Sequence, residues 1–519
     1  MDTQAVVSVR LLPRTDTRAW LVMALCLVPA FTAPVLPLID FYAHAFRYAI
    51  LADAGRDPWL AENYRTAWSL LPNLGLDLLG AALFRVLPAL VAARIVALVA
   101  IAAPFAGVLV LARCLHGRVT PLAVVLAGIL AHSFILGWGF ANFLLGLGLA
   151  LASLGVWIAL VGAPARQLAF AVAAGVAIFL THGFVFALWG LSLAAVEVAQ
   201  AADGGRPGLR KLPRRLFRLS AVAALPVLLF LASATAGGEG GVTAAAGNLA
   251  AHLRDGTFGE RILDEVRLRL DGTLRVAESG WPVADRLFGL ALWGLLGFGL
   301  ATGRLRLDRR LRFVAVLAAL LAVAVPPGLF GVGHLPERLP LVLLAVLAGG
   351  LVPSLGGGVA IARALSVLLP LHLLMVTVVW TGAGESYRGF LRATEHLPGR
   401  LLAAPAFAAE SQGRDAQRAC KPLSFLLGLE RGIAVPTFAD PTQQPLRIAG
   451  PLAAAIAASD AREAASPGLA GTAQVRALFA SGFDLVVFCH APKAAAEAIA
   501  GAGIVGEGRG WVLYRRDAR

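Results

Sequence analysis

Three ionisable side chains of different chemistry recur at helical spacing early in this 519-residue chain, in the segment Asp40-Phe-Tyr-Ala-His44-Ala-Phe-Arg47. The i, i+4, i+7 spacing places all three on one face of a helix. Ionisable groups at an apolar boundary are costly unless they pair or face a wet cavity, which makes them functional candidates. A carboxylate can accept a proton from a hydroxyl, and a guanidinium can bind a phosphate. The alternative is a surface helix that Asp40 caps, pairing with His44 or Arg47.

Further along, Asp77 lies in an otherwise apolar segment, which favours a buried pairing between this carboxylate and an arginine. Tyr64 and Trp68 also share a helix face, and amphipathic aromatic side chains near a bilayer are typical of interface anchors. We therefore expect Asp77 to belong to the site and the two aromatic residues to lie at the membrane surface.

Polar residues also mark other helix ends, at His182 and in the run His334-Leu-Pro-Glu337-Arg338. A lone histidine is more often simply hydrogen-bonded, but an arginine beside a histidine and a glutamate suits an anionic phosphate. The sequence contains no P-loop, no dinucleotide fingerprint and no Gly-x-Ser-x-Gly elbow. These absences argue against nucleotide-driven transport.

The elements that carry these residues are membrane helices. Only 15% of the residues are charged and 58% are hydrophobic, and the apolar residues come in repeated blocks long enough to span about 30 Å of hydrocarbon. The formal charge of +14 sits in loops and is nearly all arginine, since the only lysines are Lys211, Lys421 and Lys493. The positive-inside rule explains this balance better than a nucleic-acid partner, so we expect no nucleic acid.

Basic clusters fall on every second connection, as expected of cytoplasmic loops, so the N-terminus is placed in the cytoplasm. An odd number of about eleven spans then places the C-terminus outside. The expected spans are residues 19–39, 94–112, 121–137, 142–162, 167–181, 184–200, 220–236, 287–303, 313–330, 339–355 and 364–382.

Two outer loops, residues 40–93 and 237–286, are too long and too polar to be simple connections. Within the first loop, residues 72–92 are expected to form a helix on the membrane surface. The chain therefore divides into a transmembrane domain, residues 1–382, and a soluble extracytoplasmic domain, residues 383–519.

In the soluble tail, residues 483–490 and 510–516 resemble strands, and residues 491–500 a helix opened by a proline. Residues 424–439 are a candidate for another helix and strand. This order predicts a small α/β domain. Cys420 and Cys489 are the two cysteines that share this outer compartment, and both a disulfide and two buried thiols fit them.

Several segments together resemble the GT-C superfamily of polyprenyl-phosphate-sugar-dependent glycosyltransferases, and more narrowly a group of bacterial membrane proteins of that build. The resemblance runs through most of the chain and is carried by these motifs: Asp40-x-x-x-His44-x-x-Arg47, Tyr64-x-x-x-Trp68-x-x-x-Pro72-Asn73-Leu74-x-x-Asp77, Gly139-Phe-Ala-Asn142-Phe, Thr181-His182 and Asp440-Pro-Thr-Gln-Gln-Pro445.

The resemblance implies that Asp40 is a catalytic base or a metal ligand. Many members carry a second acidic residue beside the first, whereas Ile39 and Phe41 flank Asp40 here. That departure leaves a divalent metal open and fixes no cofactor. A carboxylate can act as a general base without a metal.

The expected activity is transfer of a sugar from a polyprenyl-phosphate donor to an extracytoplasmic lipid, glycan or protein acceptor, in the bacterial inner membrane. Arg47 and Arg338 would hold the phosphate, and Asp40 would deprotonate the acceptor. His44 or His182 would orient groups or neutralise charge on the leaving phosphate.

Three other readings stay open. An O-antigen ligase or polymerase also uses lipid-linked sugars, although such proteins generally lack a long α/β tail. A transporter or flippase would more often show inverted repeats and polar residues at the midplane, and neither is evident in the sequence. A GT-C-like scaffold could bind lipid or a partner without catalysis, which the single acidic residue allows.

Overall fold

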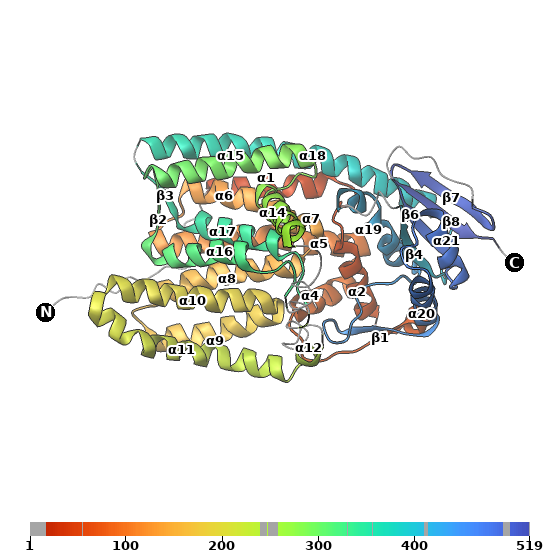
Figure 1. Cartoon of the computed structure of the whole chain (residues 1–519), viewed down its shortest axis with the longest axis horizontal. Helices are drawn as coiled ribbons and strands as arrows, with labels where there is room; N and C mark the ends of the chain where they lie inside the picture. Colours follow the sequence, from red (N-terminus) through yellow and green to blue (C-terminus); the bar gives the residue numbers. More distant parts are fainter. Residues whose placement is uncertain are drawn as a thin grey trace.

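The structure is a computed structural model of the whole chain. It describes residues 17–53, 55–238, 247, 258–329, 331–354, 356–408, 414–490 and 499–517. The expected fold class, a polytopic α-helical membrane protein with a C-terminal α/β domain, is confirmed. Figure 1 shows the long helices running roughly parallel, with the sheet of the C-terminal domain beyond one end of the bundle.

A helix lies at each of the expected spans. The bundle helices are α1 (Thr17–Thr32), α5 (Ala89–His116), α6 (Pro121–Ala131), α8 (Ala141–Ala159), α9 (Pro164–Thr181), α10 (Gly183–Asp203), α11 (Gly205–Leu231), α15 (Pro282–Ala301), α16 (Arg312–Ala324), α17 (Leu335–Gly350) and α18 (Gly357–Ala393). Among the described residues, six of these helices are long and apolar enough to cross a bilayer, namely α5, α8, α9, α10, α15 and α18.

The other bundle helices depart from a full span. Helix α11 opens with a run of arginines, and α1, α6, α16 and α17 have fewer residues than a bilayer's width requires. Nearly all of α6 and α17 is buried among other helices. Irregular chain at the ends of such helices is tolerated because it is covered by protein rather than lipid.

Close backbone contacts hold the centre of the bundle together. Helices α5 and α8 approach so closely that a Cβ added at Gly107 would lie 2.4 Å from the Gly148 carbonyl oxygen. Small residues at such a contact let two helix backbones pack directly against each other. A larger residue at Gly107 would have to push the two helices apart.

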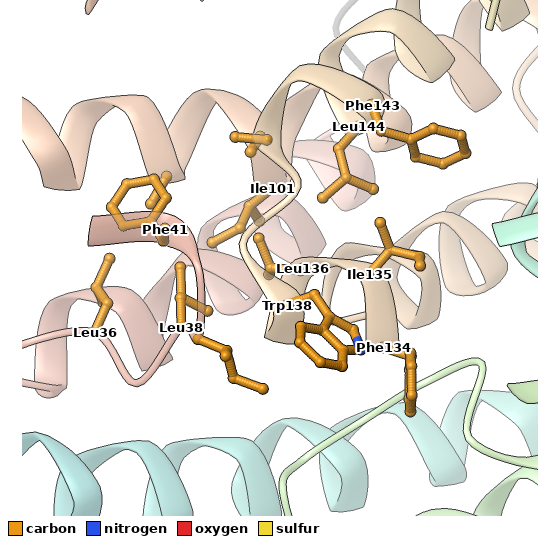
Figure 2. Close-up of a cluster of buried hydrophobic side chains, with 14 of the residues drawn as sticks. Leu36, Leu38, Phe41, Ile101, Phe134, Ile135, Leu136, Trp138, Phe143 and Leu144 are labelled. Carbon is orange, nitrogen blue, oxygen red and sulfur yellow. The ribbon is translucent and has the colours of Figure 1, made fainter. Parts of the chain in front are cut away.

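The first expected span is wrong at its outer end. Helix α1 ends at Thr32 instead of continuing to residue 39, because Pro34 and Pro37 cannot continue the helical hydrogen-bond ladder. The chain from residue 33 to residue 40 is irregular but buried. Figure 2 shows Leu36, Leu38 and Phe41 pointing into the same apolar cluster as Trp138. This packing carries Asp40 to the outer end of the bundle.

The first outer loop folds into short elements instead of one surface helix. They are α2 (Phe41–Asp53), α3 (Pro58–Asn63), β1 (Tyr64–Thr66) and α4 (Leu74–Val86). The helix expected over residues 72–92 is present as α4, but it ends at Val86, and the next residues already belong to α5.

The prediction that Tyr64 anchors a membrane interface is wrong. Tyr64 lies in strand β1, not in a helix, and is only 3% exposed. Its hydroxyl donates to the Val435 carbonyl at 2.6 Å and accepts from the Val435 amide at 2.8 Å. The periodicity suggested a helix face, but pairing of β1 with the C-terminal domain determines the local structure.

The second outer loop and the bundle connections contain the remaining short elements. These are α7 (Phe134–Trp138), α12 (Ala234–Gly237), α14 (Phe258–Leu274), β2 (Leu305–Leu307), a 3-10 turn η1 (Arg309–Leu311) and β3 (Leu351–Pro353). Strands β2 and β3 pair antiparallel.

The C-terminal domain is a four-stranded mixed sheet with helices. Its elements are β4 (Ala403–Phe407), α19 (Arg414–Arg431), β5 (Leu446–Ile448), α20 (Gly450–Ala465), α21 (Gly471–Ala480), β6 (Leu485–Cys489), β7 (Ala502–Gly508) and β8 (Trp511–Arg516). The strand order is β4-β6-β8-β7, with β4 parallel to β6 and the other pairs antiparallel.

Both strands expected in the tail, within residues 483–490 and 510–516, are present as β6 and β8. In residues 424–439 only the helix appears among the named elements, as the end of α19. The helix expected over residues 491–500 falls almost wholly outside the described residues. Cys420 and Cys489 form a disulfide with their Cα atoms 5.5 Å apart, joining α19 to β6.

The two halves of the chain interlock. Helix α18 crosses the expected domain boundary at residue 382 and continues to Ala393. Strand β1 of the first outer loop pairs antiparallel with β5 of the tail, and α19 packs against α2. The first outer loop therefore lies between the bundle and the C-terminal domain.

Candidate active site

A polar cavity of about 1030 Å³, counting the part open to solvent, lies where the bundle, the first outer loop and the C-terminal domain meet. All but one of the site residues expected from the sequence line it. These lining residues are Asp40, His44, Arg47, Asp77, His182, His334 and Arg338. Four separate segments of the chain thus deliver one cluster of charged and imidazole groups.

Asp40 sits directly before α2, at the end of the buried irregular segment. Its backbone amide donates to the Trp138 carbonyl at 2.8 Å, which fixes its position against α7. The residue is 5% exposed, and its Oδ1 lies 2.8 Å from the Nζ of Lys421 on α19. The expected alternative, pairing with His44 or Arg47, is not what the described contacts show: the charged partner of Asp40 is Lys421.

His44 and Arg47 lie one turn apart on α2, and both face the cavity, as their spacing predicts. Arg47 Nη1 donates to Nδ1 of His44 at 3.0 Å, which leaves the ring proton on Nε2. Burial and the neighbouring Arg47 cation hold the pKa of His44 well below its usual range. His44 is therefore neutral at pH 7 and presents an N–H donor.

Arg47 is also the arginine partner that the sequence predicts for Asp77. Its Nε lies 2.7 Å from Asp77 Oδ1, and each side chain is 1% exposed. Burial raises the pKa of Asp77, and the Arg47 charge and hydrogen bond oppose that rise. The Arg47 guanidinium also lies over the Tyr48 ring, with its central carbon 5.4 Å from the ring centroid. Arg47 is thus already engaged on several sides.

Arg338, in the first turns of α17, is engaged differently. Its Nη1 lies 3.2 Å from Nε2 of His182, and its guanidinium stacks over the rings of Phe140 and Phe143 at 4.4 and 5.0 Å. Among the described residues no carboxylate pairs with it, and its buried Nε has no hydrogen-bond partner. Burial and the Arg338 cation lower the pKa of His182 well below its usual range. The arrangement offers an anion a buried, oriented cation.

His334 and Glu337 form a third group at the cavity edge. His334 Nδ1 lies 3.4 Å from Glu337 Oε1, and the imidazole packs 4.2 Å from the Trp138 ring centroid. Glu337 is buried but does not line the cavity, so it differs from the other expected site residues. Its place is behind His334, where it can orient that ring.

A second cavity, with about 960 Å³ of empty volume, adjoins the polar one and shares His182 and Gln443 with it. Its walls are mainly apolar and come from α9, α10 and α11. The apolar lining includes Phe179, Phe184, Phe186, Pro226, Val227 and Phe230. The polar cavity and the apolar groove therefore lie next to each other, and His182 lines both.

The sequence reasoning missed three contributors from the tail, Phe438, Gln443 and Gln444, which line the polar cavity. Their segment is tied down at both ends. Thr437 donates from its hydroxyl to the Ala43 carbonyl at 2.9 Å, and the Thr235 hydroxyl donates to the Thr442 carbonyl at 2.6 Å. The only signal for this segment was the Asp440–Pro445 motif, noted for its resemblance and without a role.

Lys421 was also missed, although it is one of only three lysines in an arginine-rich chain.

The side chain of Asn142 holds the start of α4. Its amide oxygen accepts from the Leu76 amide at 3.3 Å, and its nitrogen donates to the Asn73 carbonyl at 3.3 Å. These bonds fix the start of α4, the helix that carries Asp77.

The carboxylates of the cavity do not fit a divalent cation. Asp40 is paired with Lys421 and Asp77 with Arg47, so each of the two carboxylates already faces a cation through its Oδ1. Among the described residues, no group of three or more His, Cys, Asp or Glu side chains is placed to share a metal. We therefore derive no step through a metal ion.

The overall fold is similar to two crystal structures of ArnT from Cupriavidus metallidurans. The structure bound to undecaprenyl phosphate is 14% identical with a TM-score of 0.47, covering 95% of this chain and 97% of that one. The apo structure is 15% identical with a TM-score of 0.49, covering 96% and 98%. No protein-family model and no curated protein sequence matches the chain.

Proposed function

We propose that the protein is a glycosyltransferase that moves a sugar from a polyprenyl-phosphate donor to an extracytoplasmic lipid, glycan or protein acceptor, with Asp40 as general base. One observation carries the proposal: a cavity lined by a carboxylate, and by an arginine with no carboxylate partner among the described residues, adjoins an apolar groove between helices. A lipid-linked phosphosugar has parts that complement these features: an isoprenoid chain for the groove, a phosphate for the arginine, and a hydroxyl-rich sugar ring.

The phosphate binds at Arg338 in this proposal. Its guanidinium is buried, is held by two aromatic rings and His182, and has no carboxylate partner among the described residues. A desolvated cation of fixed orientation binds an anion more strongly than an exposed one. Arg47, which the sequence suggested as a second phosphate ligand, adds positive potential but is already bonded to Asp77 and His44.

The isoprenoid chain lies in the groove between α9, α10 and α11. Aromatic and aliphatic side chains make up most of its lining, and His182 stands where this groove meets the polar cavity. A donor that enters from the outer leaflet can therefore keep its chain in an apolar environment while its phosphate reaches Arg338.

Asp40 accepts the proton of the acceptor hydroxyl. The acceptor oxygen then forms a bond to the anomeric carbon, and the bond between that carbon and the phosphate oxygen breaks with inversion. The electron pair leaves with the polyprenyl phosphate, whose charge Arg338 stabilises. His44 is neutral, because its pKa is low, and serves as a hydrogen-bond donor through Nε2 rather than as an acid.

The orientation in the bacterial inner membrane belongs to the same proposal, with the N-terminus in the cytoplasm and the C-terminal domain outside. The Cys420–Cys489 disulfide supports it, since disulfides persist in oxidising compartments. The exposed arginine-rich start of α11 supports it from the opposite side of the membrane.

The test is a radiolabel transfer assay with the full-length protein, a panel of polyprenyl-phosphate sugars and membrane lipid extract as acceptor. We expect Asp40→Asn to lower kcat by about 10²–10⁴-fold, the usual range for removing a general base. Asp484→Asn is the matched control, because Asp484 pairs with Arg516 in the C-terminal sheet, away from the cavity.

Three outcomes separate the alternative functions. Transfer that is lost in Asp40→Asn and kept in Asp484→Asn supports the glycosyltransferase. If the wild type transfers no sugar from any donor, a transporter or a non-catalytic scaffold replaces it. Polymerisation of donor units without the lipid extract would favour a polymerase of the O-antigen type.

A further inference from the structure

Helix α19 reaches from the C-terminal domain into the active site. It packs against α2 so closely that a Cβ added at Gly428 would lie 2.7 Å from the Phe46 ring. Near the start of this helix, three residues within one turn make long-range links. Arg418 lies 2.9 Å from Glu278, Cys420 is joined to Cys489, and Lys421 lies 2.8 Å from Asp40.

The disulfide and the ion pair come from adjacent residues, Cys420 and Lys421. Strand β6, which holds Cys489, lies inside the sheet between β4 and β8, so it is held by hydrogen bonds on both sides. A covalent link to such a strand fixes the backbone of α19 at Cys420. The backbone position of Lys421 is therefore set by the sheet of the C-terminal domain.

The pair itself is only partly closed. The Lys421 side chain is 26% exposed and the Asp40 side chain 8%, and Asp40 also lines the polar cavity. Lys421 does not line that cavity, so it touches the site through the carboxylate. A cation that binds one oxygen of a carboxylate fixes the rotation of the whole group.

We propose that Lys421 is a positioning residue for Asp40, held in place by the Cys420–Cys489 disulfide, so that the C-terminal domain completes the active site. This inference rests on the proposed function. Lys421 forms an ion pair with Oδ1 and leaves Oδ2 for the acceptor hydroxyl. The proton passes from the acceptor oxygen to Asp40, and no bond forms or breaks at Lys421.

A purely structural pair makes a different prediction. If the contact only secures the domain, its loss lowers stability without a specific effect on kcat. If Lys421 positions the base, its loss lowers kcat at an unchanged donor KM, and the effect depends on Asp40.

The experiment compares Lys421→Met and Lys421→Arg in the full-length protein, using the same transfer assay. We expect Lys421→Met to lower kcat by about 10²-fold, the usual consequence of a misplaced catalytic group, with donor KM changed by less than about twofold. Lys421→Arg keeps a cation within reach and should recover most of that loss. The control is Arg431→Met, which removes a cation from the same helix that bonds the Leu391 carbonyl instead.

Two further variants test the connections. In the Asp40→Asn background, Lys421→Met should change the residual rate by less than about twofold, because its target is gone. The double variant Cys420→Ser/Cys489→Ser should lower kcat in the same direction as Lys421→Met. A kcat loss of equal size in both backgrounds, or an effect confined to donor KM, would overturn the proposal.

Wild type, Asp40→Asn, Lys421→Met and the double variant Asp40→Asn/Lys421→Met are also compared by thermal unfolding. Tm shifts that are less than additive confirm the contact, and additive shifts overturn it. A wild type that transfers no sugar overturns the proposed function, and this cycle then decides the pairing separately.

Discussion

Two carboxylate–cation pairs face the same cavity, and they differ in almost every respect. Arg47 and Asp77 both come from the first outer loop, 30 residues apart, and each side chain is 1% exposed. Asp40 and Lys421 come from opposite ends of the chain, and the lysine is 26% exposed. The first pair is closed, because both of its side chains are almost wholly buried, whereas the second is open, with its carboxylate 8% and its lysine 26% exposed. The closed pair shapes the site, and the open pair is available for chemistry.

The difference follows from the surroundings of each acid. Asp77 lies on α4, whose first turn is fixed by Asn142, and Arg47 is held by the acid, His44 and the Tyr48 ring. Asp40 has one charged partner, which reaches it from another domain. Buried pairs add little net stability but are costly to break, because one charge is left without a partner. The comparison therefore predicts a loss of stability at Asp77 and a loss of rate at Asp40.

The largest expected effect on stability comes from Asp77→Ala. It leaves Arg47 buried without its carboxylate, which costs about 3–5 kcal/mol in the free energy of unfolding. Thermal or denaturant unfolding in detergent measures this loss. The matched control is Asp264→Ala on α14, whose pair with Arg267 is exposed at 77% and 69%. That change should cost less than about 1 kcal/mol. Equal costs for the two variants would show that Arg47–Asp77 is not the closed structural pair described above.

The next effect concerns Arg338, the other arginine that lines the cavity, which has no carboxylate partner among the described residues. Arg338→Met should raise donor KM by about 10–100-fold, since a hydrogen bond to a charged group contributes about 1.5–3 kcal/mol. Arg304→Met is the control, because Arg304 also stacks on a phenylalanine, 4.8 Å from the Phe298 ring centroid, but lies outside the cavity. A donor KM that stays constant in Arg338→Met would move the phosphate to Arg47.

The sequence predicted the closed pair better than the open one. Helical spacing placed His44 and Arg47 on one face, and a charge in an apolar helix pointed to a buried arginine partner for Asp77. Both inferences depend on local periodicity and on the cost of an unpaired charge. Lys421 had no such signal, because its contact with Asp40 depends on how a distant domain packs against the bundle.

The errors have the same physical origin. The span expected to reach residue 39 stops at Thr32, since hydropathy does not register the prolines that follow. Tyr64 and Trp68 matched a helix face, but β1 pairs with β5 of the tail and buries Tyr64. Proline geometry overrides the apolar pattern in the first place, and tertiary contacts override the helical spacing in the second. The position of the tail segment that brings Gln443 and Gln444 to the cavity is likewise set by tertiary contacts.

The smallest expected effect is a pH dependence of stability that comes from two histidines of the cavity, His44 and His182. Burial and nearby cations lower the pKa values of His44 and His182, so both stay neutral when folded and bind protons more readily when unfolded. The stability they contribute is therefore fully present above the usual histidine pKa of about 6.5 and falls as the pH drops below it. Each histidine contributes a slope of up to about 1.4 kcal/mol per pH unit.

His44→Gln should flatten the fall in Tm between about pH 6.5 and pH 5, because a histidine that gains a proton on unfolding is gone. The replacement keeps a hydrogen-bonding side chain beside Arg47. The control is His396→Gln, since His396 is exposed and lies at a separate cavity in the C-terminal domain. An unchanged slope in His44→Gln would mean that His44 is protonated in the folded protein, and the Nε2 donor assigned to it in the transfer reaction would then carry a charge.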